Sequence, residues 1–168
     1  VQELKADFLR KAPARAKAIF SKFSEHSLAN DFIAVHTGYR KYIEEQMIML
    51  FQRPKRSRYW EGAFIRQLGS GNRGSFGDER QFQYREEVII SDRNPSTELT
   101  SVLRAAVRSA NAGAVIFVGD LGVYGKSVIL DHGFGLTTLY GHLSEIKLAE
   151  GDEIIKGEII VTTGNSGL

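Results

Sequence analysis

Histidines and carboxylates are the side chains of this sequence best able to do chemistry. Histidine transfers protons near neutral pH and binds metals, and protein zinc sites are built from His, Cys and carboxylates. The chain has 168 residues, with four histidines and no cysteine, so disulfides and thiolate metal sites are excluded. His26 and His36 have no partner at a metal-ligand spacing, and His132 lies in a glycine turn, where hydrogen bonding is the expected role. The fourth histidine, His142, follows a run of alternating residues.

This run has the alternation of a β-strand. Leu136, Thr138, Tyr140 and His142 are each two residues apart, and period-two alternation places such residues on one face of a strand. Tyr140 and His142 are therefore expected to line the same groove, with Thr138 beside them.

The half of the chain around His142 is rich in glycine, which separates short β-branched runs. Five runs predict strands: 82–90, 114–118, 127–131, 136–140 and 158–162. Asp131–Gly135 predicts a hairpin between two of them, and residues 99–108 have a helical pattern. Many short strands with close turn signals favour an antiparallel β domain over βαβ units.

The N-terminal region is predicted to be helical. A stripe with 4-3-4-3 spacing continues to Leu50 and consists of Leu28, Phe32, Val35, Tyr39 and Tyr42. Two shorter helices are expected before it, one carrying Val1, Leu4 and Phe8, which Pro13 should limit, and one carrying Ala16, Ile19, Phe20 and Phe23. The predicted fold class is α+β, with a helical region over 1–52, a basic and aromatic linker over 53–68, and a β domain over 69–168.

The linker begins with Arg53-Pro-Lys-Arg-Ser-Arg58, which holds four cations in six residues. It is interpreted as a solvated connection, with contact to an anionic polymer or to lipid headgroups as the alternative. The formal net charge of +2 gives no reason to expect nucleic acid as a partner. No apolar run is long enough to span a membrane. Because the chain starts at Val1, we expect a processed piece whose signal or anchor segment lies outside it.

Several motifs in the second half resemble the LytM/lysostaphin family of zinc peptidases that act on the bacterial cell wall. They are Gly113-Ala-Val-Ile-Phe-Val-Gly-Asp-Leu-Gly-Val-Tyr-Gly125, Val128-Ile-Leu-Asp-His-Gly133, Leu139-Tyr-Gly-His-Leu-Ser144, Gly151-Asp-Glu-Ile-Ile-Lys-Gly157 and Thr163-Gly-Asn-Ser-Gly167. Gly74-Ser-Phe-Gly77 with Arg80 is similar to the opening of the family's domain. The resemblance covers roughly residues 74–168. It implies the family's mainly antiparallel duplicated-hybrid-motif fold.

The resemblance also implies positions for the zinc site. The family holds zinc with a His, an Asp four residues later and the second His of a C-terminal His-x-His, and these positions fall on Asn94, on Glu98 and beyond Leu168. A carboxamide is a poor zinc ligand, and Glu is one methylene longer than Asp. Asp92, two residues from Asn94, would enter only if the register were shifted. The family's catalytic His in its Tyr-x-His-Leu strand corresponds to His142, which in a degenerate site is either catalytic or kept for packing.

These features predict a catalytically degenerate module of the periplasm or cell envelope that needs no cofactor. Its expected partner is peptidoglycan, or a cell-wall hydrolase or division protein. The alternative is an active zinc endopeptidase that cleaves peptidoglycan cross-links. A biotinyl or lipoyl carrier, suggested by 151–157, lacks the required lysine context. If the domain lacks its last strand, an uncovered sheet edge would favour a homodimer.

Overall fold

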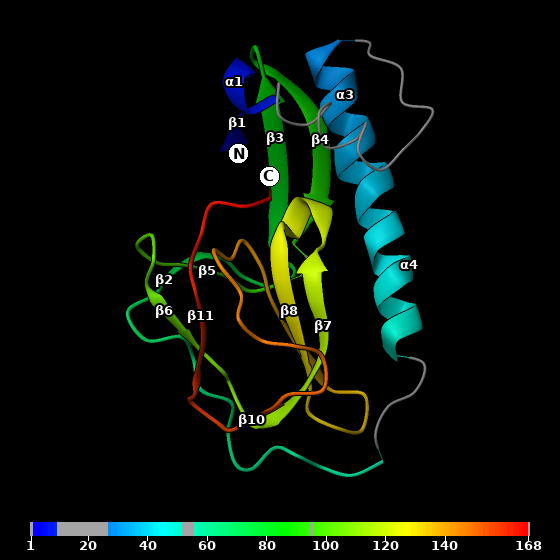
Figure 1. Cartoon of the computed structure of the whole chain (residues 1–168). Coiled ribbons are helices and arrows are strands. Elements are labelled where there is room, and N and C mark those ends of the chain that lie inside the picture. The colour runs from blue at the N-terminus through cyan, green and yellow to red at the C-terminus, as the bar shows by residue number, and fades with distance from the viewer. Residues whose placement is uncertain (1, 10–26, 52–55, 95, 168) are drawn as a thin grey trace. The chain divides into compact units, whose positions relative to one another are not determined.

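A computed structural model of the protein describes residues 2–9, 27–51, 56–94 and 96–167 (Figure 1). The helix predicted around residues 16–23 lies outside these ranges. The chain forms two compact units, one of residues 1–43 with 71–100 and one of residues 44–70 with 101–167. The predicted α+β class is confirmed, because a helical stretch is followed by mainly antiparallel strands.

The helical stretch is one continuous run with a wider turn in its middle. It comprises α3 (Leu28–Ala34), the π-helical segment η1 (Val35–Tyr39) and α4 (Arg40–Phe51). Ser27 begins it as an N-cap, since its side chain accepts a hydrogen bond from the backbone N–H of Asn30 at 3.2 Å. The helix predicted from the stripe is therefore confirmed in extent.

The face that this helix buries differs from the predicted stripe beyond residue 35. Phe32 and Val35 are buried, but Tyr42 is 40% exposed and Ile43 is buried instead. A π-helical turn contains more residues than an α-helical turn, so the residues that follow are rotated about the axis. The 4-3-4-3 pattern assumed a uniform α-helix and missed this rotation.

Unit 1, of residues 1–43 and 71–100, also contains two small sheets. Strand β3 (Glu79–Tyr84) pairs in antiparallel register with β4 (Glu87–Arg93) and in parallel with β1 (Gln2–Glu3). Strands β2 (Gly71–Gly74) and β5 (Glu98–Thr100) form an antiparallel pair. The apolar core of this unit is formed by Leu4, Leu9, Phe32, Val35, Ile43, Phe82 and Ile90.

Two predictions for unit 1 were wrong in detail. The helix predicted for Val1, Leu4 and Phe8 is strand β1 followed by the short helix α1 (Ala6–Leu9). The single strand predicted over 82–90 is a hairpin, because Arg85 and Glu86 both have positive φ and turn the chain. Neither residue is a usual type I′ turn residue such as Asn or Gly, so the sequence carried no turn signal there.

Unit 2, of residues 44–70 and 101–167, contains a four-stranded antiparallel sheet in the order β10-β7-β8-β9 and a β11-β6 pair. Their bounds are β6 (Ala106–Arg108), β7 (Gly113–Asp120), the 3-10 turn η2 (Gly122–Tyr124), β8 (Lys126–Asp131), β9 (Thr137–Tyr140), β10 (Glu153–Ile154) and β11 (Ile159–Thr162). The predicted strands over 114–118, 127–131, 136–140 and 158–162 are confirmed, as is the hairpin between β8 and β9.

The helix predicted over 99–108 was wrong. These residues form β5 and β6 with a turn between them, in which Arg104 has a φ of 62°. The Arg104 N–H donates to Thr163 O at 3.0 Å, so pairing with distant chain segments overrides the local helical pattern.

An apolar cluster packs between the strands of unit 2. It consists of Val107, Val115, Val128, Leu130, Leu143, Ile154, Ile160 and Val161. Most of these residues come from strands, which explains why β-branched side chains predominate. In the described ranges, no helix has the length and apolar character to cross a membrane.

Candidate functional site

Asn94 and Glu98 are brought together on one side of the β2–β5 pair in unit 1. Gly74 of β2 lies opposite Glu98 of β5 in the register. A Cβ on Gly74 would lie 2.7 Å from Asn94 Nδ2 and 3.8 Å from Glu98 Oε2. The glycine of the Gly74-Ser-Phe-Gly77 motif is therefore required by the packing of the asparagine side chain against the strand.

Asn94 is engaged as a structural residue. It is 1% exposed, and its Oδ1 accepts hydrogen bonds from the backbone N–H of Ser96 at 3.2 Å and from Ser96 Oγ at 3.3 Å. This is the Asx-turn geometry that asparagine adopts at the start of loops. Those two bonds commit the oxygen, the atom that could ligate a metal, to the turn, while Asn94 Nδ2 is buried without a hydrogen-bond partner.

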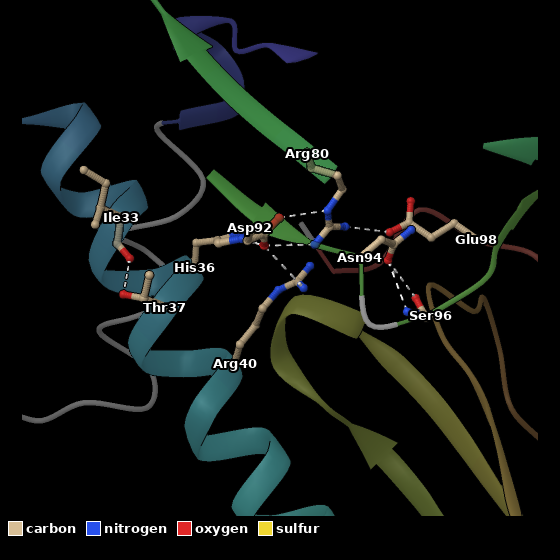
Figure 2. A network of polar contacts seen from close by, with 9 residues as sticks. All are labelled: Ile33, His36, Thr37, Arg40, Arg80, Asp92, Asn94, Ser96 and Glu98. Carbon is tan, nitrogen blue, oxygen red and sulfur yellow. Dashed lines mark hydrogen bonds and ion pairs between the residues drawn. The ribbon is translucent and has the colours of Figure 1, made fainter. Parts of the chain in front are cut away.

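Glu98 is engaged by a cation from the neighbouring hairpin. Arg80 Nη1 of β3 donates to Glu98 Oε1 at 3.0 Å, and the two side chains are only 17% and 35% exposed. Figure 2 shows the guanidinium lying between Glu98 and Asp92. The positive charge next to this carboxylate is therefore supplied by the chain itself.

Asp92 is the centre of a larger network. It accepts from Arg80 Nε and Nη2, each at 3.0 Å, and from His36 Nε2 at 2.8 Å, while Arg40 Nη1 lies 4.0 Å away (Figure 2). His36 belongs to η1 and is packed between aromatic rings, with centroids 5.4 Å from Phe32 and 4.8 Å from Phe82. The network thus ties the helix to β3 and β4 within unit 1.

The charges in this network shift two pKa values. Burial lowers the pKa of His36, and the nearby Arg40 and Arg80 lower it further, although the hydrogen bond to Asp92 opposes them. Burial by itself raises the pKa of Asp92, but the hydrogen bonds from Arg80 and His36 outweigh this effect and hold that pKa below its ordinary value. At neutral pH the network therefore pairs a neutral imidazole with an ionised carboxylate.

These residues do not fit the zinc that the resemblance implies. Asn94 is a weak donor whose oxygen is in use, and Glu98 is paired with a guanidinium. The lone pairs of Glu98 Oε1 are directed at Arg80 and not toward an open position. Over the described parts of the chain, no group of at least three His, Asp and Glu side chains is placed to hold a metal.

His142 lies in unit 2, just beyond the end of β9. Its φ of 55° is in the left-handed region, so the strand alternation ends before it. Nδ1 lies 2.7 Å from Ser166 O, and the ring is exposed. Because a carbonyl only accepts, Nδ1 carries the proton and Nε2 carries the lone pair. His142 is thereby held as the tautomer that could accept a proton or bind a cation.

Thr138 and Tyr140, the predicted groove residues, both make hydrogen bonds within unit 2. Thr138 Oγ1 lies 2.9 Å from Nε2 of the fully buried His132, whose Nδ1 donates to Ala112 O at 2.6 Å. Tyr140 OH accepts from the backbone N–H of Ala110 at 2.8 Å, and its ring packs against the apolar cluster of unit 2. Both side chains therefore contribute to the fold as well as to any groove.

Inspection of the sequence missed the polar network of unit 1. His36 and Asp92 are 56 residues apart, and nothing local marks them as partners. The position of Arg80 in the opening motif was the available signal. The motif located this arginine, but the charge pairing could be recognised only once β3 and β4 were placed.

Comparison with known proteins places the C-terminal part in a family. The model for "Peptidase family M23" matches residues 94–168. The DD-carboxypeptidase/endopeptidase Mpg of Neisseria meningitidis serogroup B (strain MC58) is 41% identical over 61 residues, which are 36% of this chain and 14% of that protein. Mpg of Neisseria gonorrhoeae is 39% identical over 61 residues, with the same shares of 36% and 14%. This chain therefore spans only a small part of the curated relatives it matches.

Solved structures show the same fold. A putative peptidase M23 from Pseudomonas aeruginosa superposes with a TM-score of 0.58 at 19% identity, covering 79% of this chain and 51% of that chain. The catalytic domain of the prophage-encoded M23 protein EnpA from Enterococcus faecalis, in a mutant form, gives 0.52 at 21% identity, covering 62% and 76%. These structures show the fold, and the family model over residues 94–168, together with the similarity to Mpg, shows that the chain carries a peptidase M23 domain of the LytM/lysostaphin family.

Proposed function

We propose that this chain acts in the bacterial cell envelope as a catalytically degenerate M23 module that binds or regulates instead of cleaving. One observation carries the proposal: Arg80 Nη1 lies 3.0 Å from Glu98 Oε1, at the carboxylate position of the family's zinc site. An internal guanidinium there pairs with the carboxylate, and the neighbouring position of the family's site holds Asn94 instead of a histidine. The expected partner is peptidoglycan, or a cell-wall hydrolase or division protein.

Metal stoichiometry tests this proposal. The full natural protein is purified without chelator, mixed with one equivalent of zinc, desalted and submitted to elemental analysis. We expect far less than one zinc per chain. One tightly retained zinc would overturn the proposal. In the variant Asn94→His/Glu98→Asp/Arg80→Gln, a gain of zinc would identify these side chains as what excludes the metal, and Arg93→Gln on an exposed ion pair serves as the control.

Binding to the cell wall is tested separately with isolated sacculi. We expect the protein to sediment with sacculi without releasing soluble peptide-containing fragments. Retention of the protein in the supernatant would contradict a peptidoglycan partner and direct the search to a cell-wall hydrolase. Wall fragments released by the protein, and lost with His142→Ala, would contradict degeneracy.

An active zinc endopeptidase that cleaves peptidoglycan peptide cross-links is the second candidate. It is favoured by the 41% identity over 61 residues with a protein named DD-carboxypeptidase/endopeptidase. It is also favoured by His142, whose Nε2 carries the lone pair. This candidate requires Glu98 to leave Arg80, and the zinc and sacculus experiments decide between the two.

A further inference from the structure

The turn between β8 and β9 carries an aromatic residue in an unfavourable conformation. Phe134 has a φ of 53° and Gly135 a φ of 79°, and the Leu136 N–H donates to Gly133 O at 3.0 Å. Positive φ at both central residues defines a type I′ turn, in which Asn-Gly is preferred. A bulky residue in the left-handed region is a genuine outlier, which is worth a functional explanation.

Packing of the Phe134 side chain does not offset the free energy of this backbone conformation. It is 66% exposed, and the neighbouring Leu136 is 43% exposed. By contrast, the ends of the turn are tightly held, since Asp131 Oδ1 accepts from the Gly133 N–H at 2.8 Å and the His132 N–H donates to Leu136 O at 2.8 Å. A rigid turn thus presents two apolar side chains to the outside of unit 2.

The described end of the basic run lies against the same turn. A Cβ on Gly133 would lie 2.0 Å from Ser57 O and 3.2 Å from Arg58 Cα, so only glycine allows the two segments to approach. The Tyr59 N–H donates to His132 O at 2.9 Å and fixes this contact. Arg56 and Arg58 are both exposed, and the Arg58 guanidinium lies 5.1 Å from the centre of the Trp60 ring.

Exposed arginines beside protruding apolar side chains are the chemistry of a protein that touches an anionic membrane surface. Cationic side chains contact the headgroups, while aromatic and aliphatic side chains enter the boundary below them. A soluble polyanion would satisfy the arginines but would offer nothing to Phe134 and Leu136. We infer that Arg56, Arg58, Phe134 and Leu136, here called the basic–apolar surface, bind the anionic lipid surface of a bilayer.

Vesicle flotation of the full protein tests this inference. The probes are vesicles of phosphatidylcholine alone and vesicles containing phosphatidylglycerol. We expect binding to the anionic vesicles only, with an affinity that falls as salt is added. Because Trp60 is the only tryptophan and lies beside Arg58, its fluorescence should report the same binding. Equal binding to neutral vesicles, or none to anionic ones, would overturn the inference.

Phe134→Asn is the decisive variant. Asn suits the left-handed turn position, so the variant should unfold at a higher temperature than the natural protein, yet bind anionic vesicles about tenfold more weakly. Phe76→Asn removes a 77% exposed phenylalanine of unit 1 and is the matched control, with binding unchanged. If Phe134→Asn bound as tightly as the natural protein, the apolar part of the surface would have no role in lipid binding.

The arginines are tested in the same way. Arg56→Gln and Arg58→Gln should each weaken binding about fivefold, whereas the double variant Arg73→Gln/Arg85→Gln, which removes two exposed arginines of unit 1, should bind normally. Two results would assign the surface to another occupant and overturn the inference. One is equal competition by a soluble polyanion such as polyglutamate without dependence on Phe134, and the other is a Phe134-dependent dimer in light scattering without lipid.

Discussion

The residues at the family's site positions differ in burial and in hydrogen bonding between the two units. In unit 1, Asn94 is buried in a turn and Glu98 is paired with Arg80 at 3.0 Å. In unit 2, His142 is exposed and is held by one side-chain hydrogen bond to Ser166 O. Asn94 and Glu98 are thus held by contacts within unit 1, whereas the ring of His142 is exposed.

The two regions also differ in what their polar groups would cost without a partner. A buried polar group must find a hydrogen-bond partner, or it costs free energy. Asn94 Oδ1 and Glu98 Oε1 have such partners in Ser96 and Arg80, whereas the buried Asn94 Nδ2 has none. An exposed histidine such as His142 carries no comparable penalty, because water solvates it.

The largest expected effect comes from removing Arg80. The change Arg80→Met leaves Asp92 and Glu98, two partly buried carboxylates, without their shared cation, and losing one partner of a largely buried ion pair costs about 3 to 5 kcal/mol. The free energy of unfolding measured in urea should fall by this amount. Arg93→Met is the control, because its pair with Glu79 is 75% and 79% exposed and should contribute less than about 1 kcal/mol. Equal losses for both would mean that the network has no special role in unit 1.

A smaller effect is expected at Thr138 in unit 2. Thr138→Val keeps the shape of the side chain but removes the donor to His132 Nε2, which lies in a fully buried ring. An unsatisfied buried acceptor costs about 1 to 3 kcal/mol. Thr137→Val on the opposite face of β9 should change stability by less than about 0.5 kcal/mol. If binding to a partner were lost in Thr138→Val while the unfolding midpoint stayed the same, Thr138 would be a groove residue first.

The sequence was most informative where local pattern and tertiary structure agree. Motifs with β-branched residues between glycines located β7, β8, β9 and β11, and the turn at 131–135, because a glycine turn leaves a strong local signal. The helical pattern at 99–108 failed because pairing of β6 with β11 depends on residues about fifty positions away. The prediction of a single strand over 82–90 failed because the turn at Arg85 and Glu86 lacks the residues that usually mark a hairpin.

In the candidate site, too, some features could be predicted from local sequence and others depend on distant residues. The resemblance placed Asn94 at a ligand position of the family, and donor chemistry then predicted that it would be a poor zinc ligand. The pairing of Glu98 with Arg80, and of Asp92 with His36, required the fold, since these partners are 18 and 56 residues apart. Their geometry is set by strand register and by a π-helical turn, neither of which leaves a local pattern.

Acid should weaken both units through a buried histidine in each. Burial lowers the pKa of His36 and of His132 below the ordinary value of 6.5. The unfolded chain therefore binds protons at a higher pH than the folded chain, so this stability is fully present above about pH 6.5 and is lost as the pH falls below it. The melting temperature measured from pH 8 to pH 5 should decline in this window. His36→Gln should remove only the part that unit 1 contributes, and an unchanged slope would contradict a neutral, buried His36.

The smallest effect is expected at His142. His142→Gly loses the hydrogen bond from Nδ1 to Ser166 O but relieves the left-handed backbone, and its backbone bonds to Tyr124 O and from the Gly164 N–H remain. These contributions oppose each other, so the free energy of unfolding should change by less than about 1 kcal/mol. His142→Val is the informative contrast, because a β-branched residue at a φ of 55° should cost about 1 to 2 kcal/mol more. A loss above about 3 kcal/mol in His142→Gly would show that the imidazole itself supports the fold. His142 would then be as much a structural residue as Asn94 and Glu98, and the two regions would no longer differ.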